Sequence, residues 1–227
     1  MTVQDGAAGL VVSDVTAYAG SRQIVRRVSM EAAPGEVVAV TGPSGSGKTT
    51  LVNIAAGLLD PGEGHAGLGG TPTWLGTGDP RPDVAMILQS YGLVSILTAL
   101  ENVSIAMRAR GLRPREADDA AVHALDRVGV TDLGERLVQE LSGGQAQRVA
   151  CARALVVDSA LMLADEPTSE LDEYNRDRVV GELRREAERG VAVVIATHDA
   201  EVAMMCDREY RLDDGALVSA IARDVMS

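Results

Sequence analysis

One nine-residue stretch, Gly42 to Thr50, combines residue types that could grip a phosphate group. It reads Gly-Pro-Ser-Gly-Ser-Gly-Lys-Thr-Thr and fits the pattern G-x-x-x-x-G-K-[ST]. Its glycines allow backbone conformations that a Cβ would block, so successive amides can converge on phosphate oxygens at a helix N-terminus. Lys48 would reach the β- and γ-phosphates, and the Thr49 hydroxyl would ligate Mg²⁺. The alternative is a glycine-rich turn that binds no ligand.

Lys48 is the only lysine of the chain, since every other side chain with a permanent positive charge is an arginine. A compact ammonium group fits between phosphates where a planar guanidinium would not. The retention of lysine at this one position favours the phosphate-binding interpretation.

A second candidate anion site lies at Leu141 to Gln145, where Ser142 and two glycines precede a helix expected from Ala146 to Val156. A serine hydroxyl and free amides at a helix start attract anions, although the same residues also form ordinary caps. The chain therefore carries two helix starts that could hold the same phosphates.

Polar residues follow three further apolar segments that we expect to be parallel strands. Gln89 follows residues 83–88, Asp165 and Glu166 follow residues 161–164, and His198 follows residues 191–197. The carboxyl ends of parallel strands form the edge at which α/β sheets bind ligands. Asp165 suits Mg²⁺ binding through a water molecule or behind the direct ligands, and Glu166 suits a base that polarises water, although carboxylates at such ends can also be simple caps.

Composition limits the remaining choices. The 227 residues carry a formal net charge of −12, which argues against a broad nucleic-acid surface. Cys151 and Cys206 lie far apart and in no C-x-x-C pattern, so we expect two reduced thiols. Residues 1–6 do not resemble a signal peptide, and no run of about 18 apolar residues could span a membrane. A membrane function would need another chain to supply the span.

The remaining elements predict an α/β fold with a helical insert. Residues 9–40 look like an antiparallel β patch, and Tyr18 within it could stack on a nucleotide base. Residues 60–83 are rich in Gly, Pro and Thr and favour an irregular connection with short strands. Thr98 and Glu101 have the spacing of a capping box, and a further helix is expected at 115–128. Helix 173–188 and a hairpin at 209–218 complete the pattern.

The motifs, taken in their order along the chain, resemble those of the ATP-binding subunit of ABC transporters. The resemblance covers nearly the whole chain, about 11–218. The resemblance implies a P-loop NTPase core with a mostly parallel central sheet, formed by residues 1–89 and 159–227. Residues 90–158 would form a helical subdomain inside this single nucleotide-binding domain. The residues carried over by the motifs are Tyr18, which would stack on adenine; the phosphate loop with Gly42, Ser44, Gly45, Ser46, Gly47, Lys48, Thr49 and Thr50; Gln89; the signature Ser142, Gly143, Gly144 and Gln145; Asp165 and Glu166; Asp172; and His198.

The resemblance also implies a mechanism that one chain cannot complete. ATP and Mg²⁺ held by one subunit would be covered by the signature residues of a second, head-to-tail subunit, identical or not. Lys48, Glu166, His198 and Gln89 would be catalytic, and Thr49, Gln89 and Asp165 would hold the metal. Closure and reopening would drive transmembrane permease subunits, which would hold the protein at the cytoplasmic face of the membrane.

Segments 89–93 and 97–103 resemble the subgroup that serves lipoprotein release, macrolide or peptide export and the cell-division complex. Two features depart from the subgroup: residues 60–83 look shorter than its usual connection and lack its arginine-rich helix, and Ser95 stands where proline is common. A third departure is Glu170, which replaces the small residue usual at this place in the family. We expect Glu170 to add negative charge where two subunits meet and to weaken their closure.

Three functions fit this pattern to different degrees. The first is an ATPase that energises a transporter, in the exporter or lipoprotein-handling class. The second is an ATP-driven regulatory switch that acts through a membrane partner without moving a substrate. The third, a soluble relative in DNA repair or translation, is disfavoured by the acidic charge and by the single undivided ATPase unit.

Overall fold

The computed structural model describes residues 9–223. The prediction about a signal peptide at residues 1–6 therefore lies outside the described part of the chain. The strands are β1 (Leu10–Ala19), β2 (Arg22–Ala32), β3 (Val37–Thr41), β4 (Glu63–Leu68), β5 (Thr71–Pro72), β6 (Val84–Ile87), β7 (Leu161–Asp165), β8 (Ala192–Thr197), β9 (Arg208–Asp213) and β10 (Ala216–Ala222). The helices are α1 (Lys48–Ala56), α2 (Ala99–Arg108), α3 (Pro114–Arg127), α4 (Gly143–Leu155), α5 (Glu173–Glu188) and α6 (Ala200–Met204).

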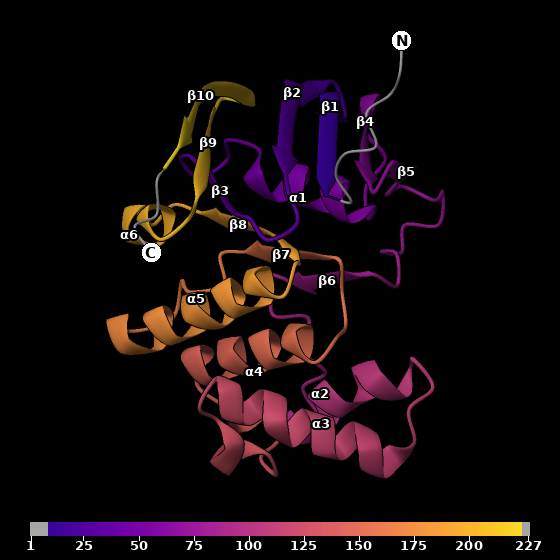
Figure 1. Cartoon of the computed structure of the whole chain (residues 1–227), viewed down its shortest axis with the longest axis vertical. Helices are drawn as coiled ribbons and strands as arrows, with labels where there is room; N and C mark the ends of the chain where they lie inside the picture. The colour runs from indigo at the N-terminus through magenta and orange to yellow at the C-terminus, as the bar shows by residue number, and fades with distance from the viewer. Residues whose placement is uncertain (1–8, 224–227) are drawn as a thin grey trace.

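Two sheets organise these elements (Figure 1). A six-stranded sheet has the order β10-β9-β3-β8-β7-β6, in which only β10 is antiparallel to its neighbour. An antiparallel sheet with the order β2-β1-β4-β5 lies above it in the view of Figure 1. The mostly parallel sheet and the N-terminal antiparallel patch confirm the predicted fold class.

Alternating side chains of the central strands face two separate cores. In β3, Val37 and Ala39 pack toward α4 and α5, whereas Val38 and Val40 pack toward α1 and the antiparallel sheet. Strands β7 and β8 repeat this alternation, and all their residues are buried. Such strands, buried on both faces, are typical of α/β folds.

The predicted irregular connection at 60–83 contains more order than the sequence suggested. Its strand β4 pairs with β1, from Leu10 with Leu68 to Thr16 with Glu63, and so belongs to the antiparallel sheet. Helix α4 also begins earlier than expected, at Gly143 instead of Ala146. The capping box of Thr98 and Glu101 at α2 is confirmed.

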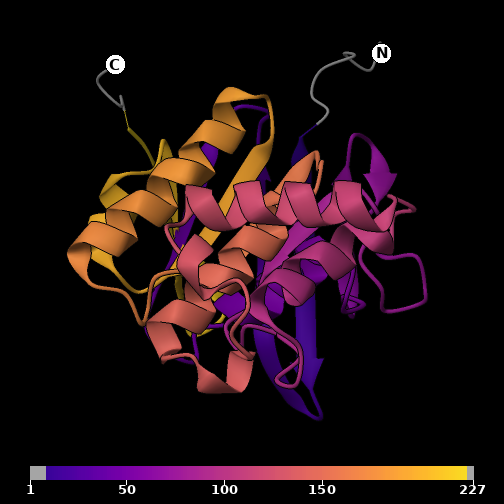
Figure 2. The same cartoon turned by 90° about the horizontal axis from the view of Figure 1, so that it is seen from below.

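Helices α2, α3 and α4 pack together on the side of the sheet away from β1 and β2 (Figures 1 and 2). The described residues between β6 and β7 contain helices and no strand, and the division of the chain at residues 90–158 stays a prediction. Cys151 and Cys206 are buried as free thiols, and burial raises the pKa of each to about 12. Both thiols therefore stay protonated at neutral pH.

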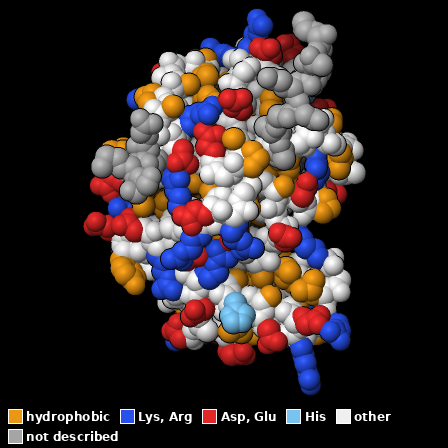
Figure 3. Space-filling view, viewed as in Figure 1, with side chains coloured by type: hydrophobic (Ala, Val, Ile, Leu, Met, Phe, Trp, Pro, Cys, Tyr) orange, Lys and Arg blue, Asp and Glu red, His pale blue; other side chains and the backbone are white. Residues whose placement is uncertain are grey.

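An arginine network joins the insert to the core. Arg127, the last residue of α3, donates to Glu182 at 2.7 Å and to Glu186 at 2.5 Å, and both glutamates are buried in α5. Arg178 of α5 donates to the backbone oxygens of Asp126 and Arg127. Basic side chains gather over α5 and its neighbours in Figure 3. Because the two carboxylates are buried, they depend on arginine partners for their charge balance.

We predict that Arg127→Met destabilises the fold, because it removes charge partners from two buried carboxylates while keeping most of the apolar stem. The expected loss is about 2–4 kcal/mol in the free energy of unfolding, measured by urea denaturation. Arg115→Met is the matched control, since Arg115 is exposed on the same helix. Equal midpoints for the two variants would contradict this account.

Candidate functional site

The loop between β3 and α1 is folded around its own lysine. Gly47 is the N-cap of α1 with φ at 102°, and Gly42 and Gly45 of the loop also have positive φ. Lys48 is buried, and its Nζ donates to the backbone oxygens of Gly42 at 2.8 Å and Pro43 at 3.3 Å. The ammonium group is thus held at the start of α1, where the helix dipole also favours an anion.

The glycines of this loop are required by close packing. A Cβ at Gly42 would lie 2.1 Å from the backbone oxygen of Leu212, and one at Gly47 would lie 2.8 Å from that of Ile24. Both approaches are too short for a carbon atom. Strands β2 and β9 therefore press directly on the loop, so that it cannot accept larger residues at these two positions.

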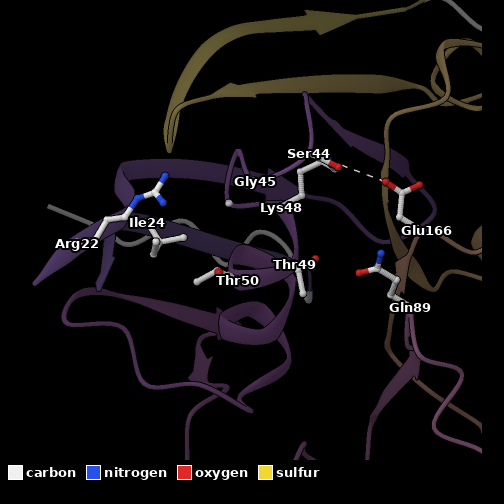
Figure 4. Close-up of a pocket in the computed structure, with 10 residues that line it drawn as sticks. Arg22, Ile24, Ser44, Gly45, Lys48, Thr49, Thr50, Gln89 and Glu166 are labelled. Carbon is white, nitrogen blue, oxygen red and sulfur yellow. Dashed lines mark ion pairs between the residues drawn. The ribbon is translucent and has the colours of Figure 1, made fainter. Parts of the chain in front are cut away.

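A cavity of about 300 Å³ opens beside the loop. Figure 4 shows Glu166 and Gln89 at one side of it and Arg22 at the other, with the loop and Ile24 between them. The cavity is lined by Arg22, Ile24, Ser44, Gly45, Gly47, Lys48, Thr49, Thr50, Gln89 and Glu166.

The order of the central strands explains why these groups meet. Strands β3, β8, β7 and β6 are neighbours and parallel, so their carboxyl ends share one edge. Lys48 follows β3, His198 follows β8, Glu166 follows β7 and Gln89 follows β6. The predicted assembly of these four residues at one sheet edge is what the structure contains.

Glu166 occupies a strained and well-contacted position. Its φ is 51°, in a region that non-glycine residues rarely adopt. One carboxylate oxygen, Oε1, lies 2.9 Å from Nδ1 of His198 and 3.9 Å from Nζ of Lys48. Its backbone oxygen accepts from Nε2 of the buried Gln147 at 2.7 Å. The carboxylate is therefore fixed between a histidine and the loop lysine.

Asp165, the last residue of β7, is buried beside this carboxylate. Burial raises its pKa and the charge of Glu166 adds to the rise, while Thr49 and Lys48 partly oppose it. Its Oδ1 is buried and has no hydrogen-bond partner. An orphaned carboxylate oxygen fits a hard divalent cation such as Mg²⁺, which prefers oxygen ligands. The Thr49 hydroxyl and the Gln89 amide line the cavity, and their role as further oxygen ligands of a cation stays a prediction.

The signature residues lie outside this cavity. Ser142 caps α4 through a reciprocal pair of hydrogen bonds with Gln145, and neither these two nor Gly143 and Gly144 line the cavity. Asp172 caps α5 by accepting from the backbone and side-chain nitrogens of Asn175. Within one chain, both sets act as helix caps.

Helix α4 holds the surrounding loops through residues that sequence reasoning missed. Gln147 donates to the backbone of Glu166 and accepts from the amide of Glu170 at 2.9 Å. Arg153 donates to the backbone oxygens of Tyr91 and Gly92, just beyond Gln89. Polar residues in a helical segment are usually exposed to solvent. The sequence therefore gave no sign that this glutamine and this arginine contact neighbouring loops.

The N-terminal hairpin contributes residues other than the expected one. Tyr18 is half exposed, its hydroxyl lies 3.5 Å from Glu63, and it does not line the cavity. Arg22 and Ile24 of β2 line the cavity instead. Stacking of Tyr18 on a base therefore stays a prediction.

The chain is similar in sequence to known proteins of one family. The family described as "ABC transporter" matches residues 25–169. The Fe(3+) ions import ATP-binding protein FbpC of Rhizobium etli is 40% identical over 203 residues, which are 88% of this chain and 57% of that protein. The ABC transporter ATP-binding protein YtrE of Bacillus subtilis is 36% identical over 211 residues, which are 89% of this chain and 90% of that protein. The chain spans 54–62% of the length of the Fe(3+) import relatives that it matches.

Solved structures show the same fold. The dimeric structure of MJ0796, a bacterial ABC transporter cassette, has a TM-score of 0.88 and 32% identity, covering 94% of this chain and 98% of that one. A second MJ0796 structure, a dimeric post-hydrolysis state bound to ADP and Pi, has a TM-score of 0.84 and 31% identity, with the same coverage.

The buried Asp165 generates a prediction about stability and metal binding. Because its raised pKa means that the ionised form is disfavoured, Asp165→Asn should stabilise the nucleotide-free protein at pH 8 by about 1 kcal/mol, or roughly 2–4 °C in Tm. This gain should shrink as the pH falls through the raised pKa, where the native carboxyl takes up its proton.

The same variant should lose the extra Tm increase that Mg²⁺ gives in the presence of ADP. Asp158→Asn, at an exposed position before β7, serves as the control and should change neither quantity. An intact response to Mg²⁺ would refute the metal-site assignment, and a lower Tm for Asp165→Asn would contradict the account of its buried charge.

Proposed function

The chain belongs to the ABC transporter family, and from this premise we propose that it binds and hydrolyses ATP to energise a membrane transporter. One observation carries the proposal: four neighbouring strands deliver Lys48, His198, Glu166 and Gln89 to one edge of the sheet. A phosphate-binding lysine, a fixed carboxylate and an oxygen donor set for a cation are the parts that triphosphate hydrolysis needs.

Glu166 is the proposed base. The attacking water would form a bond from its oxygen to the γ-phosphorus, and the bond from that phosphorus to the bridging oxygen would break. Glu166 would accept the water proton, and ADP and inorganic phosphate would leave. His198, held 2.9 Å from Glu166, fixes the orientation of the carboxylate and would also contact the γ-phosphate.

The phosphate loop and the metal would neutralise charge. Lys48 and the amides of Gly45 to Thr50 would hold the β- and γ-phosphates, with Ser44 and Ser46 in the same loop. Mg²⁺, when bound, supplies positive charge beside the phosphate oxygens. Thr49, Gln89 and Asp165 are the residues that would hold it.

The signature residues would act across a dimer. ABC ATPase subunits act as dimers with permease subunits, and the MJ0796 relative was solved as a dimer. Because Ser142, Gly143, Gly144 and Gln145 lie outside the cavity of their own chain, we propose that they cover ATP held by a second subunit. Asp172, at the start of α5, would lie near the same junction.

The permease would dock beside Gln89, on the segment between β6 and α2. The buried Asn102 pins this segment, since its side chain accepts from the amide of Val94 and donates to the backbone oxygens of Val94 and Thr98. The fixed segment presents Ile96, whose side chain is 72% exposed. We propose that residues 90–158 move as one helical unit when the permease displaces the segment that carries Ile96.

We propose an exporter or lipoprotein-handling complex, with the protein at the cytoplasmic face of the membrane. The resemblance of segments 89–93 and 97–103 to that subgroup supports the assignment. No helix in residues 9–223 is long and apolar enough to cross a membrane. Co-purification and sequencing of the permease would test the class, since an import permease like those implied by the FbpC name would overturn it.

Replacement of the proposed base tests the catalytic assignment. Glu166→Gln should bind ATP but hydrolyse it about 10²-fold more slowly or worse, because the amide cannot accept the water proton. Steady-state phosphate release and calorimetric ATP affinity measure the two quantities. Normal turnover in this variant would exclude Glu166 as the base.

Replacement of Glu170 tests the proposed dimer. Its Oε2 lies 3.1 Å from the position that a Cβ on Gly143 would take, so the carboxylate stands over the first turn of the signature helix. Negative charge there should oppose an incoming triphosphate. Glu170→Ala should strengthen ATP-dependent dimerisation roughly 3- to 10-fold at low salt, and less at high salt. Sedimentation equilibrium of variants that also carry Glu166→Gln measures this, and an unchanged dimer constant would contradict the role of Glu170.

A further inference from the structure

We propose that Gln147 of α4 is a positioning residue for the hydrolytic base. Its side-chain amide holds the backbone of Glu166 in the conformation that directs the carboxylate toward the attacking water. This inference rests on the proposed function, in which Glu166 accepts the proton of that water. It assigns a role in the reaction to a residue that lies beyond the end of the signature motif.

Gln147 is polar, yet it lies in the interior of the protein. Its side chain is 1% exposed, and it is the one polar residue among the largest fully buried side chains of residues 9–223. Burial of an amide is unfavourable unless its donor and acceptor groups have partners. The hydrogen bonds of Gln147 therefore show what keeps an amide at this position.

The amide bridges the two ends of the loop 166–170. Its Nε2 donates to the backbone oxygen of Glu166 at 2.7 Å and to the hydroxyl of Ser169 at 3.2 Å. Its Oε1 accepts from the backbone amide of Glu170 at 2.9 Å. One side chain of α4 thus fixes the start and the end of the loop that carries the base.

The backbone of Glu166 needs this support. Its φ of 51° lies in a region that costs free energy for a residue with a Cβ. Its amide donates to the backbone oxygen of Ala196 in β8 at 2.8 Å, so the sheet holds one side of the residue. On the other side, the bond from Gln147 is shorter than the two from Ser169, which measure 3.3 and 3.4 Å.

The direction of the carboxylate follows from this backbone. Its Oε1 lies 2.9 Å from Nδ1 of His198, and its Oε2 accepts from the Thr197 hydroxyl at 3.4 Å. If the carbonyl of Glu166 were released, the strained backbone could relax, and the carboxylate would turn away from these partners. A displacement of about 1 Å at a reacting group can cost about 10²-fold in rate.

Gln147 can affect the rate without affecting nucleotide binding. Among the described residues, its side chain bonds to Glu166, Ser169 and Glu170, and none of them belongs to the phosphate loop 42–50. The loop keeps its own contacts, which include the bonds from Lys48 to the loop carbonyls. A positioning role therefore predicts a loss in kcat at constant nucleotide affinity.

Replacement of the amide by an apolar side chain of similar size tests this separation. Gln147→Met should lower kcat about 10- to 100-fold and leave the affinity for ADP unchanged. Steady-state phosphate release gives kcat, and calorimetry with ADP and Mg²⁺ gives the affinity. Gln147→Asn keeps an amide but is one methylene shorter, so it cannot bridge the loop and should show the same separation. If Gln147→Met does not fold, Gln147→Asn provides the test.

Thr73→Val is the matched control for the loss of a buried hydrogen bond. Thr73 is buried, and its hydroxyl donates to the backbone oxygens of Ile54 and Ala66, outside the cavity. This variant and Gln147→Met should both lower Tm, since each removes a buried hydrogen bond. At a temperature well below both melting transitions, Thr73→Val should keep the kcat of the unchanged protein.

A double-mutant cycle identifies the residue through which Gln147 acts. In the Glu166→Gln background the base is already absent, so the addition of Gln147→Met should not lower the residual single-turnover rate further. If Gln147 acted only on stability or on another part of the site, the two losses would multiply.

Three results would overturn the positioning role: normal kcat in Gln147→Met or in Gln147→Asn, an equal loss of kcat in Thr73→Val, or multiplied losses in the double variant. Each would leave the proposed function intact as long as Glu166→Gln remains slow. Normal turnover in Glu166→Gln would instead exclude the proposed base, and a lack of ATP hydrolysis by the unchanged protein would count against the proposed function.

Discussion

The structure depends on the parallel pairing of β3, β8, β7 and β6, which brings four loops to one edge of a buried sheet. Every hydrogen bond of these ladders contributes to placing Lys48, His198, Glu166 and Gln89, although the four residues are spread over 150 positions of the sequence. The strands can be rigid because they are buried on both faces. The loops at their ends can then carry strain, such as the positive φ of Glu166, that an isolated segment would relax.

Charge burial is the cost of this arrangement. Asp165 and Glu166 are adjacent and buried, and the Nζ atom of Lys48 lies 3.9 Å from Oε1 of Glu166. The lysine meanwhile donates to the loop carbonyls, so it compensates the carboxylates only partly. The two carboxylates carry more negative charge than the one ammonium group neutralises. This surplus favours binding of a divalent cation, which can bring phosphate groups with it.

The sequence predicted the parts of the site that are local and left out those that arise from packing. The strand, turn and helix around Gly42 to Thr50 are contiguous, so glycine spacing and one lysine were sufficient. The same holds for the caps of α2 and α4, whose partners lie three residues apart. In contrast, β4 was obscured by Gly64 and Gly67, because its strand character comes from pairing with β1. Arg22 and Ile24 were missed because only the contact between β2 and the phosphate loop brings them to the cavity.

Helix α4 has a consequence for the energetics of the whole subunit. Gln147 near its start grips the carbonyl of Glu166, and Arg153 near its end grips the backbone beyond Gln89. Helix α4 thus links the backbone of Glu166 to the segment that follows Gln89. If a ligand bound beside Glu166 displaces that segment, thermodynamic linkage requires that a partner which displaces it first changes the affinity for this ligand by the same free energy.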